Sequence, residues 1–363
     1  MAYRNLRTVL VLTLILLVVV SGALSVTPPP PVQACNTCNF LLTWGSSGPG
    51  SGQFNFTQTG PSGIAVDSSG NVYVTDAGNN RVEKFTNTGT FILAWGSGGS
   101  GNGRFVSPAG VAVDSSGNVY VTDAGNYRVE KFTSNGTYIT QWGSGGSGPG
   151  KFGRASAFGI AVDSGGNVYV TDGGNYRVEK FTNTGTFILA WGSGGSGNGR
   201  FASPAGVAVD SSGNVYVVDS GNYRVEKFTN TGTFILAWGS GGSVNGRFNG
   251  PSGVAVDSSG NVYVVDSGNY RVEKFNSTGT YLTAWGCTNA GTGCLGGSGN
   301  GRFNGPSGVA VDSSGNVYVV DGGNYRVELF GDSTSPVPEF STVAVVAFSA
   351  LATSLYLLRR RRT

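Results

Sequence analysis

The sequence of 363 residues contains no histidine, and charged residues make up only 12% of it. The absence of histidine excludes a histidine-dependent lyase, a serine or cysteine nucleophile activated by histidine, and a zinc ion held by histidine. An oxygen-ligated ion such as Ca²⁺ remains compatible with the composition, although no repeat described below carries an extra carboxylate to mark its site. We therefore expect no cofactor, with a structural or channel Ca²⁺ as the open alternative.

The chain also lacks an excess of positive charge once its two ends are set aside. Without Arg4, Arg7, Glu339 and the arginines at 359–362, it holds 17 basic against 19 acidic residues, a formal charge of −2. A nucleic-acid-binding domain carries a strong basic patch. We therefore expect no nucleic-acid partner.

Long apolar runs occur only at the two ends of the chain. Two arginines precede the apolar run 9–20, which is followed by small residues, as is typical of a secretory signal peptide. We predict a signal peptide over residues 1–34, cleaved after Ala23 or Ala34, with an uncleaved membrane anchor as the alternative. Either interpretation places the middle of the chain outside the cell.

The second apolar run, 341–358, is uncharged and is followed by four arginines. Eighteen helical residues span about 27 Å, enough to cross a bilayer core. We predict a transmembrane segment at 341–358 and a cytoplasmic basic tail at 359–363.

The linker 333–340 ends in the tripeptide Pro338, Glu339 and Phe340, directly before the apolar run. Together these features resemble the PEF-type C-terminal sorting signals of archaeal surface proteins. The resemblance implies that an archaeosortase removes the segment and that a lipid replaces it. A simple stop-transfer anchor is the alternative, and both end at the cell surface.

Glycine is abundant, at 62 residues, but it recurs with a strict period. The motif Asp-x-x-Gly-Asn occurs six times, at spacings of 47, 49, 47, 47 and 55 residues. Its aspartates are Asp67, Asp114, Asp163, Asp210, Asp257 and Asp312. A period of this length is typical of propeller blades.

Each repeat contains four short apolar runs separated by turn residues, as at 206–209, 215–218, 224–228 and 234–238. The runs are apolar on both sides, as expected of sheets that are covered on both faces. We therefore predict an all-β fold, a six-bladed β-propeller of four-stranded antiparallel blades over residues 36–332.

The order of the strands predicts how the ring closes. An outer-strand pattern that begins with an aromatic residue and ends in Trp-Gly occurs six times, first at 40–45, ahead of any complete repeat. The last repeat stops at Phe330 after three strands. We expect the N-terminal strand to complete the sixth blade.

The stretch 251–275, PSGVAVDSSGNVYVVDSGNYRVEKF, resembles the NHL repeat of six-bladed propellers, and the resemblance extends over all six repeats. It implies the propeller fold. Some NHL-like propellers are amidating lyases whose zinc is held by histidines, which this chain lacks. Others bind partners on the face formed by the interblade connections.

The paired aspartates of each repeat, such as Asp67 and Asp76, are candidates for metal binding or acid–base work. They recur in every repeat, whereas an active site needs one set. We therefore predict structural roles: the first opens a tight turn whose glycine has a positive φ, and the second caps the next turn beside Arg81.

Four cysteines form two local pairs, Cys35 with Cys38 and Cys287 with Cys294. Their spacings do not suit one compact zinc site. One pair precedes an outer strand and the other follows one, so we expect them on opposite faces. For an exported chain we predict a disulfide within each pair.

Aromatic residues recur at two positions of the repeat. Each outer strand has one tryptophan, which we assign to packing between blades, with carbohydrate binding as the alternative. The turn between the second and third strands carries a tyrosine in five repeats and Asn80 in the first. The candidate binding residues are Tyr127, Tyr176, Tyr223, Tyr270 and Tyr325. The alternative is that each ring merely covers its own turn.

Three sequons, at Asn55, Asn135 and Asn276, are candidates for glycosylation, and we expect the last two on the face opposite the tyrosines. We predict a surface-anchored, non-enzymatic module that binds protein or glycan partners of an archaeal cell envelope. Its contact with the membrane is made by the C-terminal segment or by a lipid that replaces it. The alternatives are an extracellular metal-dependent hydrolase or lyase with an oxygen-ligated channel ion, and a purely structural envelope component.

Overall fold

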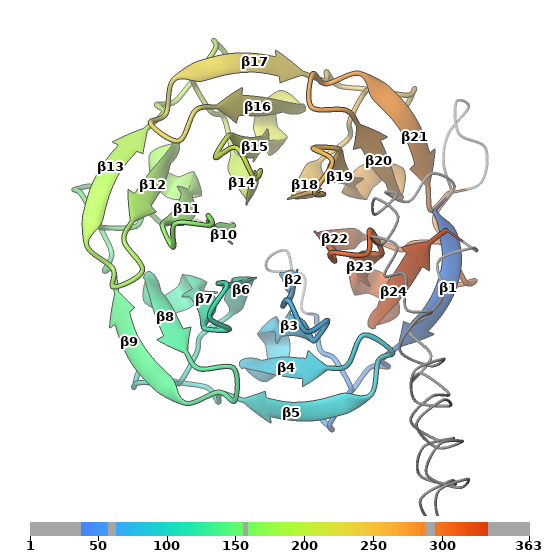
Figure 1. Ribbon diagram of the computed structural model, residues 1–363, viewed down its shortest axis with the longest axis horizontal. Coiled ribbons are helices and arrows are strands. Elements are labelled where there is room, and N and C mark those ends of the chain that lie inside the picture. The colour runs from blue at the N-terminus through green and yellow to red at the C-terminus, as the bar shows by residue number, and fades with distance from the viewer. Residues whose placement is uncertain (1–37, 57–62, 155–158, 288–294, 333–363) are drawn as a thin grey trace, which may run out of the picture. The chain divides into compact units, whose positions relative to one another are not determined.

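The computed structural model describes residues 38–56, 63–154, 159–287 and 295–332, all within the unit Ala34–Thr363. These residues form six four-stranded antiparallel sheets that surround a central axis (Figure 1). The predicted six-bladed propeller is confirmed.

The predicted signal peptide, the sorting motif and the apolar run 341–358 lie outside the described residues, and within those residues no helix is long and apolar enough to cross a membrane.

The four strands of a blade follow one another from the axis outward. The innermost strands are β2 (Ile64–Val66), β6 (Pro108–Val113), β10 (Ile160–Val162), β14 (Pro204–Val209), β18 (Pro251–Val256) and β22 (Pro306–Val311). The second strands are β3 (Val72–Asp76), β7 (Val119–Asp123), β11 (Val168–Asp172), β15 (Val215–Asp219), β19 (Val262–Asp266) and β23 (Val317–Asp321).

The third strands are β4 (Arg81–Phe85), β8 (Arg128–Phe132), β12 (Arg177–Phe181), β16 (Arg224–Phe228), β20 (Arg271–Phe275) and β24 (Arg326–Gly331). The outer strands are β5 (Phe91–Trp95), β9 (Tyr138–Trp142), β13 (Phe187–Trp191), β17 (Phe234–Trp238), β21 (Tyr281–Trp285) and β1 (Asn39–Trp44). We number the blades 1 to 6 by their innermost strands, β2 to β22.

A short 3-10 turn joins the second and third strands of every blade. These turns are η1 (Ala77–Asn79), η2 (Ala124–Asn126), η3 (Gly173–Asn175), η4 (Ser220–Asn222), η5 (Ser267–Asn269) and η6 (Gly322–Asn324). Because all six have the same length, the second and third strands pair in the same register in each blade, with the last aspartate opposite the first arginine, as in Asp219 opposite Arg224.

The hydrophobic core lies between the blades. At the boundary of blades 3 and 4, the ring of Trp191 meets Tyr169 of its own blade at 6.3 Å and Phe228 of the next blade at 5.9 Å. Equivalent contacts recur at the other boundaries, as for Trp95 with Tyr73 and Phe132. The packing role predicted for the tryptophans is therefore confirmed.

The sixth blade takes its outer strand from the beginning of the domain. Strand β1 pairs antiparallel with β24, so that Trp44 lies opposite Val327, and the Thr43 hydroxyl donates to the Val327 carbonyl at 2.8 Å. Ring closure by the N-terminal strand is confirmed. Pairing β1 to β24 also covers the edge that β24 would otherwise expose.

Two details differ from the predictions. The outer strands are not buried on both faces: in β13 and its equivalents the side chains alternate between half-buried and exposed, because no layer covers the rim. The two cysteine segments also do not lie on opposite faces. Cys38 packs in one cluster with Trp285 and Phe303, because tilted outer strands run along the rim and the end of β21 meets the start of β1 (Figure 1).

Candidate functional site

The two faces of the ring differ in their chemistry. We call the connection face the side formed by the six 3-10 turns and by the described parts of the interblade connections 46–55, 97–107, 144–154, 193–203, 240–250 and 295–305. Hydrogen bonds join the two parts, as where the Asn222 amide donates to the Gly195 carbonyl at 2.9 Å. We call the other side the turn face; it carries the Asp-x-x-Gly-Asn turns and the turns between third and outer strands.

The candidate tyrosines lie on the connection face, each directly after a 3-10 turn. All five have left-handed backbone conformations, with φ between 54° and 56°, a region that bulky side chains rarely adopt. Asn80 has the same conformation in blade 1, with φ 53°. Tyr176 and Tyr223 are the most exposed of the five, at 44% and 42%.

A cationic side chain lies next to these turns, and the sequence analysis did not identify it. A Cβ built on Gly194 would lie 3.5 Å from the Tyr176 ring, and a Cβ on the following Gly195 would lie 3.0 Å from Arg200 Cδ. The two side chains therefore lie near two consecutive glycines of the same connection. The same pairing joins Tyr127 with Lys151, Tyr223 with Arg247, and Tyr270 with Arg302.

A buried ion-pair triad holds every connection in place. In blade 2, Arg128 donates from Nε to Asp123 at 2.9 Å and pairs through a terminal nitrogen with Glu130 at 2.8 Å. Both carboxylates are fully buried. The same guanidinium donates to the carbonyls of Ser100, Gly101 and Arg104 at 2.6–2.9 Å, so it fixes the backbone that presents the exposed Arg104 side chain.

The glutamate of this triad was not singled out from the sequence. Burial raises the pKa of Glu130 to about 7, although Arg128 opposes the shift. Its equivalents Glu83, Glu179, Glu226, Glu273 and Glu328 have the same raised pKa for the same reason. One feature of the sequence could have identified this glutamate: it recurs in every repeat, next to a valine in the third apolar run, where a charged residue is unexpected.

The turn face contains the first aspartate of each repeat in a purely structural role. Asp210 accepts from the backbone amides of Ser212 and Asn214 and from the hydroxyl of Tyr216, at 2.8–3.0 Å, and Gly213 has φ 84°. This prediction is confirmed. The second aspartate pairs with its arginine as predicted, but its carboxylate makes no capping bond to the 3-10 turn and instead holds the Asn222 amide.

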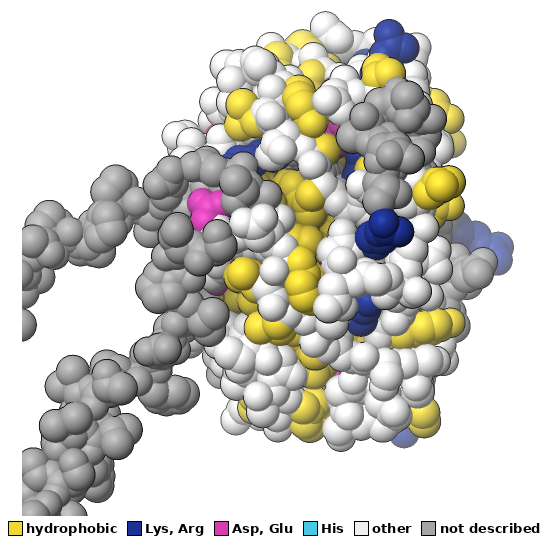
Figure 2. All heavy atoms as spheres, turned by 90° about the vertical axis from the view of Figure 1, so that its right-hand side faces the viewer, with side chains coloured by type: hydrophobic (Ala, Val, Ile, Leu, Met, Phe, Trp, Pro, Cys, Tyr) yellow, Lys and Arg dark blue, Asp and Glu magenta, His cyan; other side chains and the backbone are white. Residues whose placement is uncertain are grey.

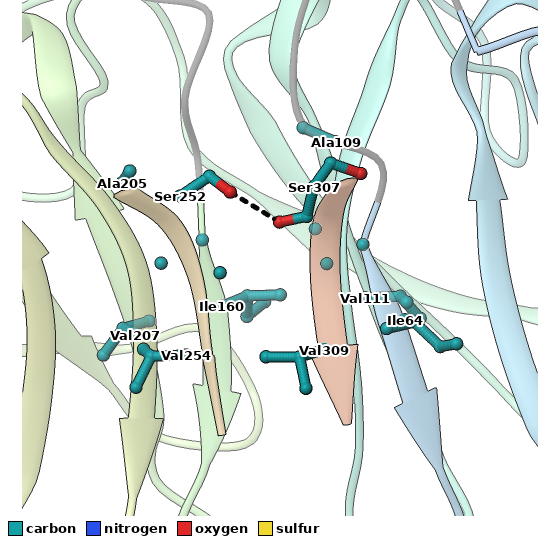
Figure 3. A pocket seen from close by; sticks show the side chains of 16 residues that line it. Ile64, Ala109, Val111, Ile160, Ala205, Val207, Ser252, Val254, Ser307 and Val309 are labelled. Atoms are coloured by element: carbon teal, nitrogen blue, oxygen red, sulfur yellow. Dashed lines mark hydrogen bonds between the residues drawn. The ribbon is translucent and has the colours of Figure 1, made fainter. Parts of the chain in front are cut away.

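The central channel is narrow and is lined by glycine, alanine, serine, isoleucine and valine. Its cavity of ≈ 70 Å³ is far smaller than a site for a drug-sized ligand. One isoleucine or valine per blade points inward, and Ser252 and Ser307 stand at one end, where the Ser252 hydroxyl donates to the Ser307 carbonyl at 2.8 Å (Figure 3).

Among the described residues, the channel lining contains no carboxylate, and no three Cys, Asp or Glu side chains cluster as metal ligands. The oxygen donors that the described lining offers a channel Ca²⁺ are therefore backbone carbonyls and two serine hydroxyls, which suit a hard cation poorly without a carboxylate.

The remaining predicted positions lie at both faces. Asn135 and Asn276 are in turns of the turn face, and their side-chain oxygens accept from Thr137 and Thr278. Asn55 lies on the connection face, where its backbone donates to Asp76. No cysteine is free within the described ranges; because Cys35 and Cys294 lie outside them, the disulfide within each pair stays a prediction.

Comparison with known proteins identifies the repeat. The model of the NHL repeat matches residues 59–85, 105–132, 159–181, 201–228, 248–275 and 303–330, so that each match covers the first three strands of one blade. No curated protein matches the chain at a significant level.

Solved structures share the fold at low identity. A streptogramin B lyase is 16% identical with a TM-score of 0.55, over 82% of this chain and 99% of the lyase. A catalytically inactive histidine-to-alanine variant of virginiamycin B lyase from Staphylococcus aureus, solved with quinupristin, is 15% identical with a TM-score of 0.51, over 78% and 88% of the two chains. A gluconolactonase from Xanthomonas campestris is 13% identical with a TM-score of 0.51, over 82% and 96%.

At such identities the likeness concerns the fold alone, because propellers of one architecture host unrelated functions. The six repeat matches coincide with the six blades. The protein belongs to the NHL repeat family and is a six-bladed NHL propeller.

Proposed function

We propose that this propeller is an extracellular, surface-anchored module that binds or scaffolds protein or glycan partners of the cell envelope and is not an enzyme. The proposal rests on the left-handed tyrosines of the connection face. A bulky residue in this conformation is strained, and such strain concentrates at functional sites. Five such turns lie on one face, and two of them present an exposed aromatic ring with a hydroxyl, at Tyr176 and Tyr223, while Tyr127 and Tyr325 also pack against the core. Exposed tyrosines of this kind favour recognition.

The enzymes with the same fold do not argue for catalysis here. The virginiamycin B lyase variant is inactive because one histidine is replaced by alanine, and this chain has no histidine. All its described carboxylates except Asp332 are held in ion-pair triads or in turns, as Asp219 and Asp210 illustrate. Groups that are already bonded on all sides are poorly placed to act on a substrate.

The terminal apolar runs support the proposed location. Residues 9–20 suit export, and 341–358 suit retention at the membrane or replacement by a lipid. A propeller held in this way would present one of its faces to the envelope.

The test is co-sedimentation of the soluble domain with isolated envelopes of the source organism. We expect binding by the wild-type domain and at least tenfold weaker binding by a variant with Tyr176→Asn, Tyr223→Asn and Tyr270→Asn. Asparagine keeps the turn, since Asn80 already occupies the equivalent position. The control carries Ser211→Glu and Ser258→Glu on the turn face; loss of binding by the control alone would overturn the proposal.

A further inference from the structure

Among the residues that the structure describes, the connection face presents positive charge to solvent without exposed negative charge. Six cationic residues in these connections have exposed side chains: Arg104, Lys151, Arg154, Arg200, Arg247 and Arg302. Five of them, all but Arg154, occupy equivalent positions, one in each of five connections. The first connection has Gln53 at this position. In the described part of the chain none of the five makes an ion pair, since every salt bridge involves other basic residues.

The carboxylates beneath these cations are inaccessible. The twelve acidic residues of the six triads are all 0% exposed, and each is paired with the triad arginine of its blade, as Asp219 and Glu226 are with Arg224. The exposed cations therefore remain available to a ligand from solvent. In the side view of Figure 2, lysine and arginine side chains appear mainly toward one side of the ring.

Each complete pair combines an aromatic face with a cation on a rigid base. Tyr176 and Arg200 lie near two consecutive glycines of one connection, and the half-buried Arg224 donates to the Arg200 carbonyl at 2.7 Å. Side chains on a backbone that is already ordered lose less entropy on binding. Four blades carry this pair, while Asn80 and Gln53 break it in the first and last.

We propose that the connection face binds an acidic polysaccharide, with sugar rings stacked on the tyrosines and carboxylates paired with the neighbouring arginines or lysine. The inference rests on the proposed binding function and names its ligand class. A uronic acid polymer carries one ring and one carboxylate in each sugar, which matches one tyrosine and one cation in each pair. Guanidinium groups bind carboxylates in a planar, two-bond geometry.

The repetition of the site also fits a polymer better than a compact partner. Four nearly identical pairs around a ring contact four similar units of one chain, and weak contacts add up when they are linked. A nucleic acid fits less well, because its dense phosphates require a strongly basic surface, whereas the domain has a formal charge of −2.

The test uses the folded soluble domain with immobilised polygalacturonate as the acidic probe and dextran as the neutral one. We expect polygalacturonate to bind, salt to weaken binding, and dextran not to bind. Replacing the four cations, with Lys151→Gln, Arg200→Gln, Arg247→Gln and Arg302→Gln, should weaken binding about tenfold or more, since several exposed ion pairs act together.

A control with the same change in net charge separates local contacts from the overall field. Ser115→Glu, Ser211→Glu, Ser258→Glu and Ser313→Glu place four charges on exposed serines of the turn face, and binding should stay within about twofold of wild type. Equal losses in both variants would overturn the proposal. The aromatic contribution is tested by the double variant Tyr176→Asn with Tyr223→Asn. This variant should bind polygalacturonate more weakly than wild type, while the salt dependence of its binding stays the same as that of wild type.

A single-stranded poly(U) RNA of equal length serves as the competing polyanion. Tighter binding of RNA than of polygalacturonate would overturn the inference. Failure of polygalacturonate to bind, with envelope binding that still depends on the tyrosines, would refute the acidic ligand and leave the proposed function standing. Loss of tyrosine dependence in both assays would refute both.

Discussion

Tyr176 occupies a backbone conformation, φ 56° and ψ 44°, that suits glycine or asparagine better than an aromatic residue. The residue is 44% exposed, so the packing that its side chain gains is incomplete. Two types of residue lead to predictions at this scale. The exposed tyrosines bear on recognition, and the buried glutamates bear on how stability depends on pH.

Replacing Tyr176 by asparagine should change the free energy of unfolding by less than about 0.5 kcal/mol, because relief of strain offsets the lost ring contact. Urea unfolding measures the change. The control is Tyr216→Phe, which removes a 3.0 Å hydrogen bond from a buried ring to Asp210 and should cost about 1–2 kcal/mol. A loss above about 1.5 kcal/mol for Tyr176→Asn would show that the ring is a packing residue.

The buried glutamates should make the domain less stable as the pH rises from 5 to 8. Burial raises the pKa of Glu226 from 4.5 to about 7 in the folded state. The folded state therefore binds more protons in this window, and the stability gained by protonation is lost as the pH passes 7. Urea unfolding at pH 5, 6.5 and 8 should show this fall, and Glu226→Gln should reduce it by about one sixth. Constant or rising stability over this range would contradict the prediction.

At the scale of elements, the connection between two blades needs glycine at several positions, and the physical requirement for glycine differs from one position to the next. Gly192 has φ 105°, and a Cβ there would approach Phe201 Cε2 to 2.6 Å and the Tyr176 carbonyl to 2.8 Å. Gly199, in the same connection, has φ 72° and only the Phe228 ring within 4 Å, at 3.9 Å. One glycine is needed for both space and conformation, the other for conformation alone.

Gly199→Ala should therefore cost about 1 kcal/mol, the penalty of a left-handed alanine. Gly192→Ala should cost more than about 2 kcal/mol, because neighbouring atoms must also move. Thermal unfolding of the two variants measures the difference. Equal losses would show that the connection adapts to the added Cβ.

Strand β1 is the element that closes the ring. A chain that starts at Gln53 lacks β1, exposes the edge of β24 and loses the contacts of Trp44 with Tyr318 and Phe85. We expect a lower melting temperature and association in size-exclusion chromatography. A chain that starts at residue 36, just ahead of β1, is the control and should remain monomeric and stable. An unchanged melting temperature without β1 would contradict closure by this strand.

At the scale of the whole molecule, the two faces of the propeller carry different kinds of side chain. The turn face holds bonded aspartates and the sequons of Asn135 and Asn276, while the connection face carries the tyrosines and the exposed cations. This division agrees with the proposed function.

From the sequence we predict that both ends of the chain are processed. The mature protein should lack the run 9–20 and, if the sorting signal is used, everything after about residue 340. Intact mass of protein from native membranes measures both. Detection of the arginines at 359–362 in the mature chain would leave a simple anchor in place of the sorting signal.

The sequence by itself determined the blade count, the strand order and ring closure, because turn residues such as Gly213 and outer-strand residues such as Trp191 recur with a fixed period. It also determined that Asp210 is structural, since local turn chemistry depends on neighbours in the chain. The pairing of Tyr176 with Arg200 was decided only by the tertiary structure. These residues are distant in sequence and are brought near the same two glycines where a connection folds across a turn. The arginine and glutamate of a triad stand close together in one strand, as Arg224 and Glu226 do, and only the fold places them beneath a connection. The meeting of Cys38 with the end of β21 was likewise decided by the tilt of the outer strands, which no local pattern encodes.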